Sequence, residues 1–351
     1  MTQATDPSAA LPPQMPPLEA MFPAEYIAAN RGPLAERVAY VFMFLELLVV
    51  ALRFISRRQI KARLGLDDYL VFPGLLFCLG MCILTIIMTR VTGMGKHMPI
   101  VAITNMDGII SWAKAGYAIE ILHSLAVVFP RLSILASYMR IFITKPYKLA
   151  AYALAFVIIA TSFAGIIVSV AQCRPFSARW SGEAAMAKYC INSMSYFRWL
   201  VFVNMITDVV MLILPIPIIW NIQLGVRERI ALILVFALGS VGLITSTIRF
   251  TIFFKVKELS TDGTWLSTDL AIWSTIEPGM YLIASCLPPL RPLFLKFLNI
   301  ARDKTYRSGN ASKGTKMSSG GITKNNTVEI VMERRSKRQS DISDEERMIQ
   351  I

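Results

Sequence analysis

The chain has 351 residues, 55% of them hydrophobic, and its mean hydropathy is +0.53. This composition excludes an ordinary soluble domain and predicts an integral membrane protein. The formal net charge is +13, but the basic residues lie in short loops and in the C-terminal tail, where anionic lipid and the rules of membrane orientation explain them better than nucleic acid. We therefore expect the lipid bilayer as a partner and no binding of nucleic acid.

Residues 1–34 form a proline-rich lead without an apolar core, so we expect a mostly extended extracellular segment and no signal peptide. Seven apolar segments of membrane-spanning length follow. They occupy residues 35–56, 69–89, 116–142, 149–171, 197–220, 230–254 and 271–295. Segments of this length are typical of helices and unlike the short alternating strands of membrane barrels. The predicted fold is all-α, with seven transmembrane helices in a domain at 35–295.

The second span begins with Gly65, Asp67, Asp68 and Tyr69 in the sequence Gly-Leu-Asp-Asp-Tyr. Paired carboxylates at a helix N-terminus complement the helix dipole, so capping is the main prediction. The same acids can pair with the basic residues just before them, which are Arg57, Arg58, Lys61 and Arg63. Binding of a partner at the inner face of the membrane is the alternative interpretation.

Ionisable residues inside the spans are costly, and they sort by depth. Glu120, His123, Arg249 and Glu277 fall in the outer part of their spans, Glu46 and Asp208 near the midplane, and Arg53 and Arg131 in the inner half. On the third span, the spacing puts Glu120, His123 and Arg131 on one helix face. Asn204 and Asp208 lie four residues apart and share a face of the fifth span, and Glu46 is the candidate partner of Asp208 at the same depth.

Two interpretations of these polar residues stay open. In the first, the outer group is the polar floor of a ligand cavity, and Glu46, Asp208 and Asn204 form a buried layer sensitive to protons or ions. In the second, they are ties between helices that stabilise the packing by about 0.6–2 kcal/mol each. Arg249 has a further explanation, which is that its side chain extends to the lipid headgroups.

Cys173 and Cys190 lie together in one polar loop. The contrast in loop charge is weak, but the basic tail favours an external N-terminus and a cytoplasmic C-terminus. With this orientation, a disulfide between the two cysteines would lie on the external side, where oxidation is allowed. At the end of the fifth span, Pro215 and Pro217 remove two backbone donors, which predicts a kink or an early helix end.

Residues 296–351 are predicted to form the cytoplasmic tail. Over 291–307, apolar residues fall on one side of a helix and basic residues on the other, which favours an amphipathic helix on the inner membrane surface. From about Ser308 the composition is typical of disorder. The triplets at Asn310 and Asn325 would be glycosylated only if the tail were external, so they test the topology.

Motifs of catalysis and cofactor binding are missing from the sequence. Two histidines exclude a histidine-rich metal site, and the cysteine spacing does not fit zinc. The last span has no lysine to hold retinal. We therefore expect no enzyme activity, no cofactor and no metal.

Several motifs occur together in a characteristic order. They are Leu64 to Tyr69; Ser133-Ile134-Leu135 with Tyr138; Arg140-Ile141-Phe142; Cys173-Arg174-Pro175 with Trp180 and Cys190; Asn204, Asp208 and Leu214 to Pro217; Gly239 with Arg249; Glu277; and Leu287-Pro288-Pro289-Leu290-Arg291-Pro292. The set resembles the fungal rhodopsin-like integral membrane proteins, which are seven-helix proteins similar to G-protein-coupled receptors. The resemblance implies an external N-terminus and, for some relatives, sensing of a host or surface or a place beside secondary-metabolite genes. The lead lacks the cysteine-rich domain of some members, and Arg131 stands where a lysine is expected.

The sequence thus predicts a receptor-like plasma-membrane protein that senses an extracellular or membrane-borne small ligand and acts on a cytoplasmic signalling partner. The alternative is a proton-coupled transporter, with Glu46 and Asp208 carrying the proton, or an accessory membrane protein of a secondary-metabolite pathway.

Overall fold

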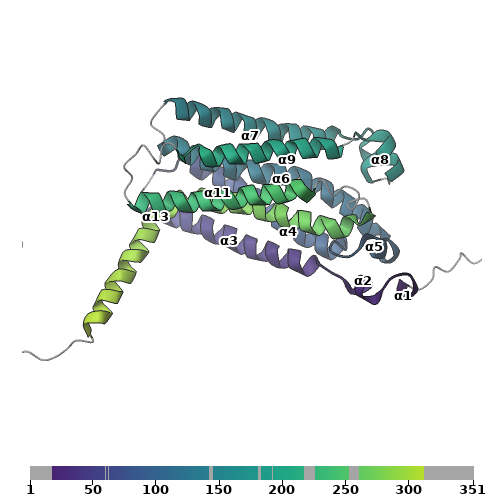
Figure 1. Ribbon diagram of the computed structural model, residues 1–351, viewed down its shortest axis with the longest axis horizontal. Coiled ribbons are helices and arrows are strands. Elements are labelled where there is room, and N and C mark those ends of the chain that lie inside the picture. Colours follow the sequence, from purple (N-terminus) through teal and green to yellow (C-terminus); the bar gives the residue numbers. More distant parts are fainter. Residues whose placement is uncertain are drawn as a thin grey trace, which may run out of the picture. The chain divides into compact units, whose positions relative to one another are not determined.

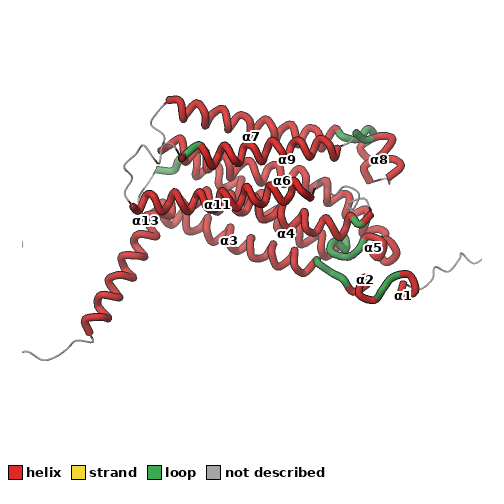
Figure 2. The backbone as a smooth tube through the Cα atoms, in the orientation of Figure 1, coloured by secondary structure: helices red, strands yellow, loops and turns green. Residues whose placement is uncertain are grey.

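The computed structural model describes residues 18–59, 61, 63–141, 145–180, 183–191, 193–216, 226–252 and 261–311. The regular structure of these residues is helical, and they contain isolated β-bridges but no β-strand (Figure 2). The predicted all-α fold is therefore confirmed for the described residues.

Seven long helices occur in the described residues. They are α3 (Gly32–Gln59), α4 (Leu66–Val91), α6 (Met106–Ile141), α7 (Lys145–Ala171), α9 (Ser193–Ile213), α11 (Val226–Ile252) and α13 (Gly263–Ala311). Five described segments have the length and apolarity of membrane spans, and they are Ala24–Gln59, Leu66–Val91, Met106–Arg140, Lys145–Ala171 and Gly263–Leu290. The number of seven spans and the direction of insertion stay predictions.

Short helices gather at one end of the helical bundle (Figure 1). They are α1 (Leu18–Met21), α2 (Ala24–Ala28), α5 (Met98–Thr104), η1 (Phe176–Trp180) and α8 (Glu183–Tyr189). The prediction of a mostly extended lead is therefore wrong for residues 18–28, which form α1 and α2, while 1–17 lie outside the described residues.

Aromatic contacts explain the folded lead. The ring of Tyr26 stacks on His97 with centroids 3.7 Å apart, and His97 stacks in turn on Trp265 at 4.1 Å. Arg31 lies over the same Trp265 and pairs with Asp269 at 3.1 Å. These contacts come from distant parts of the chain, so they override the extended tendency that local proline content predicts.

Prolines end one long helix, α9, but not another, α13. Helix α9 ends at Ile213, one residue before Leu214-Pro215, as the early-end interpretation requires. Pro217 lies outside the described residues. Helix α13 instead continues through Pro288 and on through the predicted amphipathic segment 291–307. The helical character of that segment is therefore confirmed, and its location on the inner membrane surface stays a prediction.

Two compact units divide the chain after Lys296. In the first unit, one apolar cluster joins α6, α7, α9 and α13, and another joins α3, α4, α6 and α13. Helices α6 and α13 contribute to both, so they carry the core of this unit. Asn310 falls in the last turn of α13 and Asn325 outside the described residues, so the glycosylation test stays a prediction.

Candidate functional site

A network of buried polar side chains joins α6, α9, α11 and α13, with Arg131 of α6 at its centre. Nη2 of Arg131 lies 2.7 Å from Oδ1 of Asp208 on α9. It also donates to the hydroxyl of Tyr281 on α13 at 3.1 Å, and the guanidinium lies 4.6 Å from the centroid of that ring. All three side chains are buried, so these charges interact away from water.

The network continues through α11. The hydroxyl oxygen of Ser246 lies 2.8 Å from Oδ2 of Asp208 and 2.8 Å from Oε1 of Glu277. One turn further along, Nη1 of Arg249 lies 2.5 Å from Oε2 of Glu277 and 2.5 Å from Nε2 of His123. Nε2 of His123 also lies 3.3 Å from Oε2 of Glu277. Because arginine can only donate and a carboxylate can only accept, the contact of Nε2 with Arg249 is a hydrogen bond in one tautomer of the ring and the contact with Glu277 in the other.

Charge in the network is balanced by pairing. Arg131 and Arg249 supply two positive charges, and ionised Asp208 and Glu277 supply two negative ones. A buried charge is tolerated when it is paired, and Arg131 with Asp208 and Arg249 with Glu277 form such pairs. Nε of both arginines has no hydrogen-bond partner among the described residues, so the charges are paired but not every donor is satisfied. Ser246 makes this balance adjustable, because its single proton satisfies only one carboxylate. The second short oxygen contact is favourable when a carboxyl group carries a proton, so the network can accommodate one exchangeable proton.

Helical spacing brings these residues together. The pairs Asn204 and Asp208, Ser246 and Arg249, and Glu277 and Tyr281 are each three or four residues apart, so each pair lies on one face of its helix. The predicted shared face of Asn204 and Asp208 is present, since Nη1 of Arg131 also donates to Asn204 at 3.5 Å.

Gly242 on α11 permits the position of Tyr281. A Cβ atom at this glycine would lie 2.6 Å from the tyrosine ring, closer than real Cβ contacts allow. The missing side chain therefore lets α11 and α13 approach closely enough for Tyr281 to reach Arg131.

Glu46 does not pair with Asp208, so that prediction is wrong. Arg131 and Ser246 contact Asp208 instead. Glu46 is 1% exposed, and among the described residues neither of its carboxyl oxygens has a hydrogen-bond partner. It faces α13, where a Cβ at Gly279 would lie 2.8 Å from its Oε1. The two acids share a depth in the sequence pattern, but depth does not specify the direction in which each helix face points.

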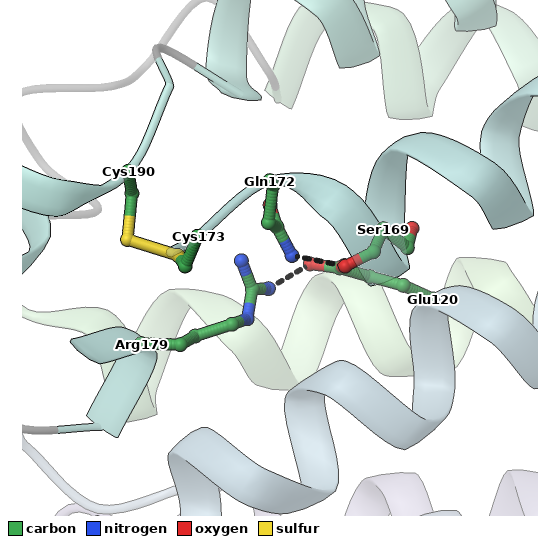
Figure 3. The surroundings of a disulfide bond; sticks show 6 residues. All are labelled: Glu120, Ser169, Gln172, Cys173, Arg179 and Cys190. Carbon is green, nitrogen blue, oxygen red and sulfur yellow. Dashed lines mark hydrogen bonds and ion pairs between the residues drawn. A yellow bond between two sulfur atoms is a disulfide. The ribbon is translucent and has the colours of Figure 1, made fainter. Parts of the chain in front are cut away.

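Arg249 does not extend to the lipid headgroups, which corrects the alternative drawn from its position in the sequence. Its side chain is 11% exposed and is held by Glu277 and His123. Of the predicted outer group, three members thus join the network around Arg131. Glu120 lies apart, paired with Arg179 of η1 (Figure 3).

The loop that carries Arg179 is closed by the predicted disulfide between Cys173 and Cys190, which is confirmed (Figure 3). Backbone hydrogen bonds from Ile191 to Gln172 at 2.8 Å and from Arg174 to Tyr189 at 3.0 Å hold the same two strands of chain together. The loop is therefore a fixed structure at the end of the bundle where the short helices gather.

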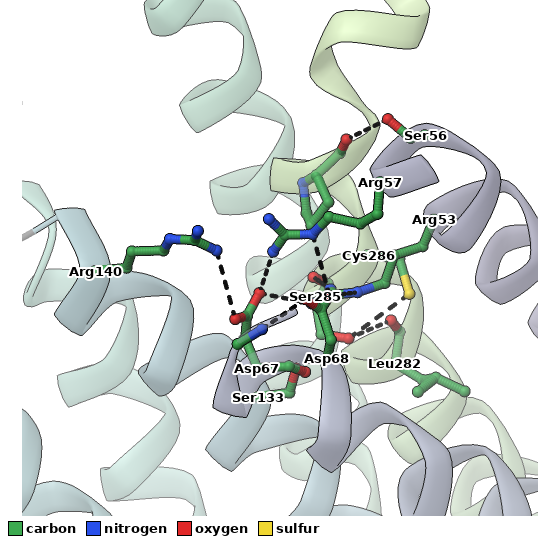
Figure 4. A network of polar contacts seen from close by, with 12 residues as sticks. Arg53, Ser56, Arg57, Asp67, Asp68, Ser133, Arg140, Leu282, Ser285 and Cys286 are labelled. Carbon is green, nitrogen blue, oxygen red and sulfur yellow. Dashed lines mark hydrogen bonds and ion pairs between the residues drawn. The ribbon is translucent and has the colours of Figure 1, made fainter. Parts of the chain in front are cut away.

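A second polar network lies where α3 ends and α4 begins, beside α6 and α13 (Figure 4). Arg53 of α3 is fully buried and contacts Asp68 at 2.9 Å and Asp67 at 2.7 Å. Its Nη1 donates to the backbone carbonyl of Ser285 on α13 at 2.5 Å. Arg57 contacts the same two carboxylates, at 2.6 and 3.2 Å.

The acidic pair both caps α4 and pairs with basic residues, as the sequence predicted. The carboxylate of Asp68 accepts from the N–H of Gly65 at 3.1 Å, which caps α4. Of the four basic residues named from the sequence, Arg57 is seen to pair with the acids, whereas Arg53, one turn earlier, was not among them. Its position four residues before Arg57 on the same helix face is the signal that could have found it.

The remaining motif residues are placed as follows. Tyr69 is 60% exposed. Pro288 lies within α13, beside Pro289, whose carbonyl accepts from the hydroxyl of Ser56 at 2.6 Å. Nothing is described of the Arg291 side chain. The residues that the structure describes contain no group of three or more His, Cys, Asp or Glu side chains arranged to hold a metal ion.

A small pocket borders the first network. Asp208 and Tyr281 line it together with Ile134, Tyr138, Met211, Leu212, Gly239 and Ala284. Its cavity volume is about 20 Å³. The apolar residues come from the same four helices as the network, so any change in the packing of these helices alters the pocket.

Comparison with known proteins places the chain in a family. A profile of the fungal rhodopsin domain matches residues 52–296. The chain belongs to the fungal rhodopsin domain family. It is 31% identical over 287 residues to the polyenoic acids biosynthesis gene cluster protein Ba17b of Metarhizium anisopliae, covering 79% of this chain and 78% of that protein.

Two further relatives of this fungal rhodopsin domain protein carry different names. The SAT4 family membrane protein of Emericella nidulans is 28% identical over 220 residues, which are 62% of this chain and 54% of that protein. Receptor GIN3 of Arthrobotrys oligospora is 25% identical over 300 residues, 82% of this chain and 69% of that protein. No solved structure matches the chain.

Family membership confirms the resemblance that the motifs gave, and it identifies a multi-pass membrane protein. The matched residues of the fungal rhodopsin domain include every member of the network around Arg131. Glu46 precedes them.

Proposed function

We propose that this fungal rhodopsin domain protein is a receptor-like sensor in the plasma membrane. In this proposal it crosses the bilayer seven times, with the N-terminus outside and the C-terminus in the cytoplasm. It binds a small ligand from outside the cell or from the bilayer and acts on a cytoplasmic signalling partner. It catalyses no reaction and needs no cofactor, metal or nucleic acid. A relative named as a receptor supports this class of function.

The network around Arg131 carries the proposal. Arg131 reaches four acceptors on two helices. They are Asp208 at 2.7 Å and Asn204 at 3.5 Å on α9, and Tyr281 at 3.1 Å and Glu277 at 3.5 Å on α13. A small shift of one helix exchanges these partners without leaving the charge unpaired. Two packings of the bundle then differ little in free energy, which is what a ligand needs to shift a conformational equilibrium.

The test is whether the network is a switch or only a tie. The full chain is reconstituted in lipid nanodiscs with cysteines introduced at Leu149 of α7 and Phe236 of α11, which are 71% and 44% exposed. Spin labels attach selectively there, because the described free cysteines are buried and Cys173 and Cys190 are bonded. Electron paramagnetic resonance then measures the distance distribution between α7 and α11.

Ser246→Ala removes the hydroxyl that bridges the two carboxylates, and Thr247→Val is its matched control on the exposed side of the same helix. A switch gives a second population of distances in Ser246→Ala and an unchanged distribution in Thr247→Val. A single unchanged distance in both variants, with only the thermal stability of Ser246→Ala lowered, identifies a tie and refutes the proposed switch.

A proton-coupled transporter is the second candidate, and the two short contacts of the Ser246 hydroxyl with Asp208 and Glu277 favour it. The Ser246 hydroxyl has one proton for two carboxylates at 2.8 Å, so both contacts are hydrogen bonds only when Asp208 or Glu277 is protonated, and that proton would be the one transported. Relatives named for biosynthesis clusters support a role beside a biosynthetic pathway, either as this transporter or as an accessory membrane protein. Uptake into vesicles that depends on an imposed pH gradient, and that is lost in Asp208→Asn, would support the transporter over the sensor.

A further inference from the structure

The closed loop at the end of the bundle covers a site that is short of hydrogen-bond donors. Glu120 of α6 points from the bundle towards this loop, and one carboxylate oxygen, Oε1, pairs with Nη2 of Arg179. The other oxygen, Oε2, is buried and has no partner of good hydrogen-bond geometry among the described residues. The side chains of Gln172 and Ser169 also lie near this carboxylate and contribute to its hydrogen bonding. The pair is largely shielded from water, with Glu120 24% and Arg179 13% exposed at their side chains.

Gln172 adds a second unsatisfied acceptor. Its side chain is 1% exposed and points towards Glu120 (Figure 3). The amide nitrogen donates to the backbone carbonyl of Ser169 at 3.0 Å, but the amide oxygen Oε1 has no partner. Leaving a buried acceptor unpaired is unfavourable. Oε2 of the Glu120 carboxylate and Oε1 of the Gln172 amide therefore favour an occupant that brings several donors and a positive charge.

Aromatic rings surround the same place. Tyr117 of α6 packs edge-on against Phe176 at 5.1 Å, and Phe176 against Trp180 at 4.9 Å. Arg179 lies over the ring of Tyr117 at 5.8 Å, and Lys114 over that of Trp180 at the same distance. A carboxylate beside aromatic faces is the combination that binds organic cations.

We propose that Glu120, Gln172 and Tyr117 form a binding site for an organic ammonium or guanidinium compound, and that Arg179 occupies it from within the chain when the ligand is absent. A protonated amine supplies three donors where Arg179 supplies one to Glu120, so it satisfies the oxygens that Arg179 leaves unpaired. Lys114 keeps the surroundings positive, so the ligand must displace the guanidinium of Arg179 rather than bind beside it.

This site gives the proposed sensor a ligand class, and in that respect it rests on the proposed function. Binding itself is independent of any signal. Displacement of Arg179 also releases η1 from α6, and His123, one turn inward from Glu120, is a member of the network around Arg131.

The test uses the full chain in nanodiscs of phosphatidylcholine, whose surface has no net charge to concentrate cations. The probe is 2-phenylethylamine, protonated at pH 7, and 2-phenylethanol is the uncharged compound of the same skeleton. Binding is measured by equilibrium dialysis for the wild type, Arg179→Gln, Glu120→Gln and Arg174→Gln. Arg174 is the matched control, an exposed arginine of the same loop.

An internal occupant lowers the apparent affinity by the fraction of time that the site is blocked, so a site blocked nine-tenths of the time binds about tenfold more tightly once Arg179 is removed. We expect this gain in Arg179→Gln, wild-type binding in Arg174→Gln and loss of binding in Glu120→Gln. Glu120→Asp, which keeps the charge, restores part of the binding and shows that the loss does not come from misfolding.

Equal binding of the amine and the alcohol, or an unchanged affinity in Arg179→Gln, overturns the inference. If no variant binds the amine, the inference about this site is also overturned. If Ser246→Ala nevertheless shifts the distance between α7 and α11, the proposed switch of the Arg131 network survives. Amine binding with the expected pattern but without a change in that distance supports the site and refutes the sensor.

Discussion

The strongest quantitative expectation concerns the ion pair between Arg131 and Asp208. Replacing Asp208 with leucine leaves the buried guanidinium beside Glu277, which is already paired with Arg249. Replacing Arg131 with methionine leaves the carboxylate of Asp208 uncompensated. Making both changes removes one positive and one negative charge, so the remaining pair of Arg249 and Glu277 stays balanced.

The magnitudes follow from this charge count. Removing one partner of a buried ion pair costs about 3–5 kcal/mol, whereas replacing the whole pair with apolar side chains is often neutral or stabilising. We therefore expect each single variant to lose about 3 kcal/mol or more and the double variant to lose much less than the sum of the two. The coupling energy is then several kcal/mol, well above the usual value for a hydrogen bond between membrane helices, about 0.6 kcal/mol.

Reversible unfolding of the full chain in detergent micelles provides the four free energies of the double-mutant cycle. The matched control is the pair of Glu36 and Arg90, which lie 3.2 Å apart with Arg90 61% exposed at its side chain. An exposed pair of this kind contributes about 0–1 kcal/mol. A coupling energy for Arg131 and Asp208 that is no larger than that of the control would refute the account of the network as a balanced set of buried charges.

Three further predictions concern other parts of the chain. Arg53→Met removes the buried partner of Asp67 and Asp68 and should lower the free energy of unfolding by about 3–5 kcal/mol. Arg58→Met, at an exposed position of the same helix, should change it by less than about 0.5 kcal/mol. Equal losses of unfolding free energy in the two variants would contradict the structure. Gly242→Ala forces a methyl group against the ring of Tyr281 and should lower the free energy of unfolding by about 1–3 kcal/mol. Gly116→Ala, where a Cβ would have nothing within 4 Å, should leave the unfolding free energy unchanged or raise it in the same denaturation experiment. If the tail is cytoplasmic, treatment with a glycosidase should leave the electrophoretic mobility of the expressed protein unchanged, and a shift that disappears when the two tail asparagines are replaced would invert the topology.

The long helices could be predicted from the sequence because a membrane-spanning helix needs an uninterrupted apolar length, and that length is visible residue by residue. Their ends could not be predicted as well. Helix α6 begins at Met106, ten residues before the apolar segment that predicted it, because its first turns lie beside α5 and need not be apolar. The disulfide was predictable because its two cysteines share one loop.

Partners in the candidate site were only partly predictable. The spacing on the third predicted span correctly placed His123 and Arg131 on one face, since periodicity within a helix depends on the local chain alone. It could not show that Arg131 pairs with Asp208 while Glu46 faces Gly279, because the rotation of each helix is set by close packing such as that at Gly242. Sequence depth therefore identifies which residues are costly to bury, and only packing determines which of them meet.

Helix α13 connects the two polar networks. At positions 277, 281 and 285, one turn apart, it receives arginines from three other helices. Glu277 holds Arg249 of α11, the hydroxyl of Tyr281 accepts from Arg131 of α6, and the carbonyl of Ser285 accepts from Arg53 of α3.

Because these three groups belong to one continuous helix, a displacement of α13 alters all three contacts together. The rigid helix itself therefore couples the two networks, and no chain of contacting side chains between them is needed. Arg53 is also held by two carboxylates of α4, so it resists such a displacement more strongly than Arg131, whose alternative partners are within reach. In the proposed sensor, the outer and central contacts of α13 are therefore the ones that change first, and the network of Arg53 sets the threshold for transmitting the change to the cytoplasmic end.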